Sequence, residues 1–292
     1  MSDYENVIEI ENLTKQYDGF CLDNVSLKVP KGSIMGFVGQ NGAGKSTTIR
    51  LLLGIARKNS GSIKVFGKDI YENETEIKQD ISAVFDEIPY PECLNAMQIE
   101  KVLKPLYKKW DGEAYRNYLD RFSLPRKKKI SQYSKGMKMK LQIAAALSHK
   151  AKLLVLDEAT TGLDPVIRNE ILDIFLEYLQ DADNSIFLSS HITSDLEKIA
   201  DSITFIDKGK ILLSGYKDEI LENHTIIKCS KENYELIDKD DYISARITDF
   251  GVEVMSSDKG NVMKKYPEFI FDQPKLDDII VYYVNKEKKE WS

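Results

Sequence analysis

The chain has 292 residues, 42% of them hydrophobic, which is enough for one large domain and a smaller one, each with a core. Its net charge of −6 excludes a general attraction to nucleic acid or anionic lipid. Cys21, Cys93 and Cys229 are far apart and lack metal-binding spacing, so we expect reduced cytosolic thiols without a disulfide or a zinc site. No apolar run is long enough to predict a signal sequence or a bilayer span.

The first predicted elements are strands. Between Val7 and Val29, "VIEIENLTKQY" and "FCLDNVSLKV" alternate apolar and polar residues, which predicts antiparallel strands separated by "DGF". "SIMGFVG" predicts a short buried strand, and "STTIRLLLGIA" predicts a helix after a glycine-rich stretch. "GSIKVFGKD" then returns to a strand pattern.

A helical block follows, from about Glu92 to Leu147, with interruptions at Pro105 and at "SLPRKKK". Strands and helices then alternate. "AKLLVLDEAT" and "NSIFLSSH" predict buried strands, and "NEILDIFLEYLQ" and "ITSDLEKIAD" predict helices, the second with Thr193 or Ser194 as a candidate cap. This alternation predicts a mostly parallel α/β sheet.

A glycine-rich stretch, "GQNGAGKS", satisfies the pattern G-x-x-x-x-G-K-[ST] between a predicted strand and a predicted helix. Glycines let backbone N–H groups approach phosphate oxygens at the positive end of the helix. Lys45 would neutralise the β- and γ-phosphates, and Ser46 would bind Mg²⁺. The stretch therefore predicts a phosphate-binding loop rather than a flexible turn. The expected nucleotide contacts are Gly39, Asn41, Gly42, Ala43, Gly44, Lys45, Ser46 and Thr47.

Two adjacent acids, Asp157 and Glu158, end the apolar run "LLVLDE". Asp157 is placed to hold Mg²⁺, and Glu158 to act as the general base for an attacking water. Two acids after a strand are by themselves often a solvated strand exit or a helix cap. In combination with the phosphate loop they predict ATP hydrolysis.

These motifs predict an α/β fold with a P-loop NTPase core. We expect an N-terminal antiparallel β-subdomain and a helical subdomain at about 87–148 within a main domain of residues 1–221. After this point the sequence pattern changes and no glycine-rich motif occurs, so we place a small C-terminal α+β domain at 222–292.

Over about residues 5–220 the sequence resembles the ATP-binding subunits of ABC transporters. "YSKGMKMKLQIAAAL" is similar to the signature segment LSGGQ and its helix: Ser134 and Gly136 match, whereas Tyr133, Lys135 and Met137 differ. The resemblance implies that this segment reaches the γ-phosphate held by a second subunit. Without the resemblance, Ser134 is more simply interpreted as the N-cap of an ordinary helix.

Other positions take roles from the same resemblance. "TTGLDP" resembles the D-loop, which implies that Asp164 contacts the opposite subunit, although a plain turn before a helix fits too. "LSSH" places His191 where the family's switch histidine bonds the γ-phosphate and the attacking water. Tyr17 occupies the position of the adenine-stacking aromatic residue, although a tyrosine at a strand end more often packs.

One position departs from the family pattern. Where the family usually has glutamine, this chain reads "AVFDEIPYPE", so either Asp86 or Glu87 takes its place. A carboxylate there can reach Mg²⁺ directly or through water, which makes Asp86 a third candidate magnesium ligand beside Ser46 and Asp157. How the nucleotide state is relayed to a membrane partner is left open by this departure.

The resemblance implies an ATPase that dimerises head to tail around two ATP–Mg²⁺, with Lys45, Glu158 and His191 as the catalytic group. The partners implied are a second ATP-binding subunit, either identical or a close paralogue, and a separate transmembrane permease. An exporter of a peptide, antibiotic or other amphipathic compound is favoured. The expected location is cytoplasmic, on the inner face of a bacterial membrane through the permease.

Two other functions are compatible with parts of the sequence. "DEAT" resembles a helicase acidic box, but residues 222–292 are too short and too acidic for a second helicase domain, so we expect no nucleic-acid partner. A regulator that binds ATP without transport, with the C-terminal domain as effector, stays open. The cargo cannot be inferred, because cargo contacts would lie in the membrane subunit.

Overall fold

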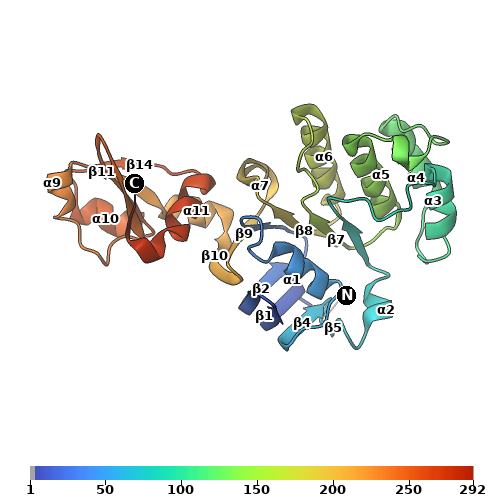
Figure 1. The fold of residues 1–292 in the computed structure, drawn as a ribbon, viewed down its shortest axis with the longest axis horizontal. Coiled ribbons are helices and arrows are strands. Elements are labelled where there is room, and N and C mark those ends of the chain that lie inside the picture. The colour runs from blue at the N-terminus through green and yellow to red at the C-terminus, as the bar shows by residue number, and fades with distance from the viewer. Residues whose placement is uncertain (1–3, 292) are drawn as a thin grey trace.

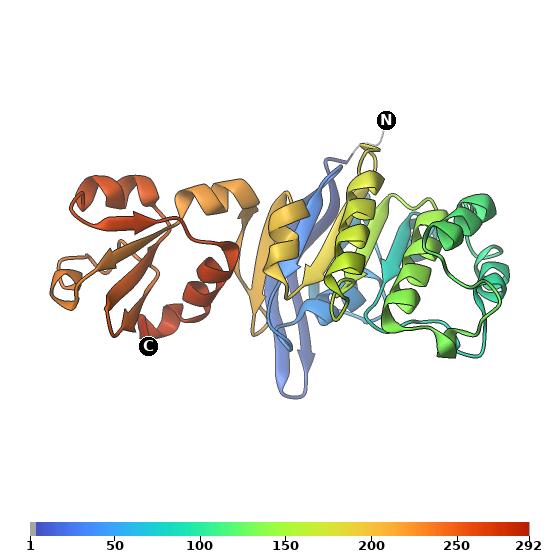
Figure 2. The ribbon, with the colours of Figure 1, turned by 90° about the horizontal axis from the view of Figure 1, so that it is seen from above.

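Three β-sheets organise residues 4–291, the part of the chain that the computed structural model describes. Figure 1 shows the C-terminal sheet at one end of the long axis, the two other sheets in the middle, and α3, α4 and α5 at the opposite end. The view from above in Figure 2 shows the same order along this axis. Among these residues, no helix has both the length and the apolar character needed to cross a bilayer.

The first sheet is antiparallel and has the strand order β2-β1-β4-β5. Its β1–β2 hairpin confirms the antiparallel strands predicted from the alternating N-terminal sequence. A short helix, α2 (Glu74–Ile77), follows it. The strands are β1 (Asn6–Tyr17), β2 (Phe20–Pro30), β4 (Ser60–Val65) and β5 (Lys68–Asp69).

The central sheet has the order β10-β9-β3-β8-β7-β6. All neighbours in it are parallel except β10 and β9, which confirms the mostly parallel sheet. Its strands are β3 (Ile34–Val38), β6 (Ile81–Val84), β7 (Leu153–Asp157), β8 (Ser185–Ser190), β9 (Ser202–Asp207) and β10 (Lys210–Tyr216).

Both faces of this sheet are covered, which explains its uninterrupted apolar strands. In β7, Leu154 and Leu156 belong to one hydrophobic core, whereas Leu153 and Val155 belong to another. Successive strand residues point to opposite faces, so both sets of side chains in a strand covered on both sides can be apolar. Because β3, β8 and β7 are parallel neighbours, their carboxyl ends meet at one edge of the sheet.

The helices of the main body lie beside the central sheet, except that α3 and α4 pack beyond α5 at the end of the molecule (Figure 1). They are α1 (Lys45–Leu52), α3 (Ala96–Leu103), α4 (Gly112–Arg121), the 3₁₀ turn Ile130–Gln132, α5 (Lys135–Ser148), α6 (Pro165–Tyr178) and α7 (Thr193–Ile199). The expected cap of α7 is wrong. Ile192 is at the N-cap position, and the hydroxyl of Thr193 donates instead to Asp277.

The C-terminal sheet has the order β14-β11-β13-β12-β15 and a core of its own that includes Ile227, Val254 and Val262. Its last helix, α11 (Leu276–Val284), packs into the core of the main body through Leu276 and Ile279. The remaining elements are α8 (Lys217–Asn223), β11 (Thr225–Cys229), α9 (Lys231–Tyr234), β12 (Ser244–Thr248), β13 (Gly251–Ser256), α10 (Lys259–Lys265), β14 (Ile270–Asp272), the 3₁₀ turn Lys286–Lys288 and β15 (Glu290–Trp291).

The predicted boundary between residues 221 and 222 falls inside α8. A division after Asn223 would keep this helix whole, and the C-terminal sheet begins directly afterwards at Thr225. The division into two domains stays a prediction, because the lobes share part of one core.

Candidate functional site

The glycine-rich loop connects β3 to α1, as expected for a phosphate loop. Gly44 has a φ of 120° and Gly42 a φ of 81°, backbone conformations that favour glycine. A Cβ on Gly39 would lie 2.4 Å from the carbonyl oxygen of Ile206. The loop therefore needs glycine both for its own conformation and for its close approach to β9.

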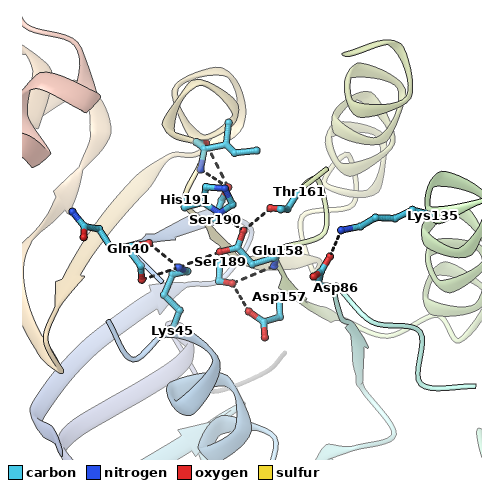
Figure 3. A network of polar contacts seen from close by, with 12 residues as sticks. Gln40, Lys45, Asp86, Lys135, Asp157, Glu158, Thr161, Ser189, Ser190 and His191 are labelled. Carbon is cyan, nitrogen blue, oxygen red and sulfur yellow. Dashed lines mark hydrogen bonds and ion pairs between the residues drawn. The ribbon is translucent and has the colours of Figure 1, made fainter. Parts of the chain in front are cut away.

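Lys45 lies across this loop and is 6% exposed. Its Nζ donates to the carbonyl oxygens of Gly39 at 2.7 Å and Gln40 at 3.3 Å, and it lies 3.1 Å from Oε1 of Glu158. Figure 3 shows this ammonium group between the loop and the carboxylate. A buried cation enclosed by main-chain oxygens and one carboxylate is a suitable partner for an anion such as phosphate.

Glu158 is the centre of the polar network in Figure 3. It follows β7 with a φ of 55°, and its Oε2 accepts from Thr161 Oγ1 at 2.6 Å. His191 Nδ1 lies 2.7 Å from the same oxygen, and the histidine follows β8. Because an ionised carboxylate only accepts hydrogen bonds, Nδ1 of His191 carries a proton in this contact.

The pKa of Glu158 is held below its ordinary value. Burial is the largest influence and favours the neutral acid, but it is outweighed by the Thr161 hydroxyl, the Lys45 ammonium and the charge of His191 together. Glu158 is therefore a carboxylate near neutral pH. The structure thus brings two of the predicted catalytic residues, Lys45 and His191, into contact with the third, Glu158.

Asp157, the last residue of β7, is hydrogen-bonded to a side chain of β8. Ser189 Oγ donates to Asp157 Oδ1 at 2.6 Å, and the backbone N–H of Glu158 donates to the carbonyl oxygen of Ser189 at 3.1 Å. These bonds orient both acids at the carboxyl edge of the parallel sheet. Ser189 and Thr161 were missed by sequence analysis, since only strand pairing and a tight turn bring them to the acids.

A hollow of about 490 Å³ opens over the loop. Of the expected nucleotide contacts, Tyr17, Gly39 and Ala43 are outside this lining, as are Ser134, Gly136 and Asp164. Tyr17 is 41% exposed, with Lys15 Nζ 5.1 Å from its ring centroid. The residues that line the hollow are Gly19, Phe20, Gln40, Asn41, Gly42, Gly44, Lys45, Ser46, Thr47 and Glu158.

Phe20 is an aromatic residue of this hollow that the sequence did not single out. It faces Tyr17 across the β1–β2 hairpin, and its Cζ lies 3.2 Å from the place of a Cβ on Gly44. The available signal was its position directly after Gly19 in the hairpin turn. Phe20, as well as Tyr17, can offer a ring to a base.

Asp86 is not brought to the hollow. Its carboxylate lies 2.6 Å from Lys135 Nζ, away from the Lys45–Glu158 contact in Figure 3. Asp86 lines a separate hollow with Glu87 and Lys138. In this structure its charge is balanced by a lysine of the signature-like segment.

The signature-like segment begins α5, apart from the phosphate loop. Ser134 is exposed and caps the helix, because its hydroxyl accepts from Met137 N at 3.2 Å. A Cβ on Gly136 would lie 2.9 Å from Ile167 Cδ1 of α6. Asp164, also exposed, caps α6 by accepting from two backbone N–H groups at 3.1 Å each. Neither Ser134 nor Asp164 lines the hollow within this chain.

The fold and this site define a P-loop ATPase domain, because the phosphate loop, strand-end acids and histidine converge on the parallel sheet. The family model described as ABC transporter matches residues 22–161. The bacitracin transport ATP-binding protein BcrA of Bacillus licheniformis is 36% identical over 212 residues, covering 70% of this chain and 68% of that protein. The lantibiotic transport ATP-binding protein SrtF of Streptococcus pyogenes is 36% identical, with 73% and 92% covered.

A solved structure of an ATP-binding subunit of an ABC transporter superimposes with a TM-score of 0.67 at 25% identity, covering 74% of this chain and 92% of that one. An ATP-binding cassette solved in its ADP conformation has a TM-score of 0.64 at 24% identity, which adds support for the fold. The chain belongs to the ABC transporter family. It is a nucleotide-binding protein and an ATPase.

Proposed function

We propose that the chain hydrolyses Mg²⁺–ATP within a dimer and so drives a separate membrane permease that exports a peptide or antibiotic. The contact of Glu158 with both Lys45 and His191 beside the phosphate loop supports the hydrolysis step of this proposal. One buried carboxylate there faces a cation for phosphate and a histidine that can orient water.

The chemistry follows from these contacts. An entering phosphate competes with Glu158 for the Lys45 ammonium, since both are anions and the group is already desolvated. Glu158 is then free to take a proton from water as its oxygen attacks the γ-phosphorus and the bond to the leaving ADP breaks. His191 remains next to Glu158 to orient that water.

Magnesium would be held by Ser46 and Asp157. Ser46 lines the hollow, and the Asp157 carboxylate is oriented by Ser189. Within residues 4–291, no group of three or more acids, histidines and cysteines is assembled for a metal. This fits Mg²⁺, which keeps several waters and phosphate oxygens beside one or two protein ligands. The ion would neutralise charge on the phosphates.

A second ATP-binding subunit would complete each site. Ser134, at the start of α5, and Asp164, at the start of α6, are exposed and lie outside the hollow of their own chain. A helix start offers free N–H groups to an anion. We therefore assign Ser134 and Gly136 to the γ-phosphate of the opposite subunit, and Asp164 to that interface.

The transport role rests on the relatives, two of which are named for bacitracin transport and lantibiotic transport and a third for daunorubicin/doxorubicin resistance. We infer export of a peptide or antibiotic-like compound through a permease in a bacterial membrane, with this chain bound at its cytoplasmic face. Affinity purification from membranes should recover one multispan protein. Recovery of none, with ATPase activity intact, would favour the regulator instead.

The Glu158→Gln variant tests the site. It keeps the size of the side chain but removes the base, so hydrolysis should fall by about 10²–10⁴-fold while ATP still binds. Phosphate release measures the loss, and size-exclusion chromatography with ATP should show a dimer of the variant. Lys45→Ala is the contrasting variant, which should lose nucleotide binding itself. Parental hydrolysis by Glu158→Gln, or a variant that stays monomeric with ATP, contradicts the proposal.

A further inference from the structure

Helix α7 connects the nucleotide site to two other parts of the molecule. It begins at Thr193, separated from His191 by one residue, so its position determines where the histidine lies. On one side it is tied to α6: Arg168 Nε lies 2.5 Å from Oδ1 of the fully buried Asp195, and its Nη2 donates to Ser194 at 3.0 Å. Figure 1 shows α7 between α6 and the C-terminal α11.

The other side of α7 is tied to the C-terminal lobe. Thr193 Oγ1 donates to Asp277 Oδ1 at 2.5 Å, and the backbone N–H of Leu276 donates to Glu197 Oε1 at 2.8 Å. From α8, Lys217 Nζ donates to the carbonyl oxygen of Glu197 at 3.0 Å. Polar contacts from α8 and α11 thus hold both ends of α7.

The contact with Asp277 is the one nearest to the histidine. Thr193 is 5% exposed, so its hydroxyl depends on this acceptor. Asp277 is not needed to start its own helix, because Asp278 accepts from the backbone N–H of Lys275 at 2.9 Å there. The two neighbouring acids therefore have separate partners: Asp278 within α11, and Asp277 on α7.

We propose that Asp277 is a positioning residue for the ATPase site: through Thr193 it sets the start of α7, and with it the orientation of His191 toward Glu158. The C-terminal lobe on this account helps, through Asp277, to position the catalytic residues of its own chain. This inference rests on the proposed function, since it needs His191 to take part in hydrolysis. It does not depend on the cargo or the permease.

The test compares Asp277→Ala with Asp278→Ala in the complete chain. Loss of the Thr193 contact should lower kcat about three- to tenfold without changing the KM for ATP. The melting temperature should also fall somewhat, because the buried Thr193 hydroxyl loses its acceptor. Asp277→Asn should restore kcat, because its amide oxygen accepts the same hydrogen bond. Asp278→Ala should keep the parental kcat. A purely structural role would change the melting temperature alone and leave the ratio of kcat to KM unaltered.

The Thr193→Val variant approaches the same contact from α7. It should match Asp277→Ala, and the double variant should lose no more than either single variant, because all of them remove one hydrogen bond. Additive losses would overturn the proposal, as would equal losses in the two acid variants or a parental kcat in Asp277→Ala. A His191→Ala control separates the two proposals. If it is inactive while Asp277→Ala is normal, only this inference fails; if it is fully active, the site assigned above fails.

Discussion

At the scale of single residues, the decisive feature is that Glu158 is ionised although its side chain is only 14% exposed. Its Oε2 accepts hydrogen bonds from Thr161 and from His191, and Oε1 faces Lys45. These partners overcome the cost of burying the charge and lower the pKa of the carboxyl group. A general base that is already ionised at neutral pH follows from this environment.

Thr161→Val should therefore raise the pKa of Glu158, because a hydrogen bond to its charged form is removed. The base then becomes protonated at a higher pH, so the acid limb of the kcat profile should move to higher pH, with kcat at the alkaline plateau little changed. Thr160→Val is the matched control, since the buried Thr160 hydroxyl makes no hydrogen bond within residues 4–291. An unshifted acid limb in Thr161→Val would rule out this role.

At the scale of elements, His149 joins α5 to the central sheet. It follows the last residue of α5, lies 2.7 Å from Ser82 Oγ of β6, and its ring centroid lies 3.7 Å from that of Tyr107. Burial lowers the pKa of His149 to about 4. Its imidazole is consequently neutral in the folded protein at neutral pH.

This depressed pKa predicts a loss of stability in mild acid. The unfolded chain binds a proton at His149 near pH 6.5 and the folded chain does not, so the free energy of unfolding falls as pH drops from about 6.5 to 4. At pH 5 this loss in the free energy of unfolding should reach about 2 kcal/mol. Urea unfolding of the parent and of His149→Asn at pH 7 and pH 5 measures it. Equal pH dependence in the two proteins would contradict this account.

At the scale of the whole molecule, the C-terminal lobe and the main body share a core. Leu276 and Ile279 of α11 belong to the same hydrophobic cluster as Leu196 of α7, whereas the C-terminal sheet also has a cluster of its own. Shared apolar packing couples the unfolding of two parts of a chain. The lobes should therefore unfold together.

Leu276→Ala should lower the free energy of unfolding by about 2–5 kcal/mol, since it opens a cavity at a fully buried position between the lobes. Two variants that each keep one tryptophan report the unfolding of the two lobes separately by fluorescence. Trp110 lies among the helices of the main body, and Trp291 lies in the C-terminal sheet. The unfolding transitions that the two tryptophans report should shift equally in Leu276→Ala. Met263→Ala, at a side chain that is 44% exposed, is the control. Separate transitions would show that the lobes are independent.

Much of this architecture could be predicted because its signals are local. The alternation of the first strands, the apolar run of β7 and the glycine spacing before Lys45 each report the conformation of neighbouring residues. Interpreting Ser134 as a helix cap was also a local inference, and its side chain does cap α5. At Asp164 the sequence indicated only a turn before a helix, and the structure adds that Asp164 caps α6. Their roles toward a second subunit stay predictions.

What the sequence by itself determined was the order of elements, the phosphate loop and the pair of acids after β7, since these depend on backbone preference and spacing. Only the tertiary structure decided that Glu158 meets Lys45 and His191, that Asp86 pairs with Lys135, and that Asp277 contacts Thr193. The physical reason is sequence separation: such contacts form where strands and helices from distant segments pack together, and no local pattern records which side chains then face each other.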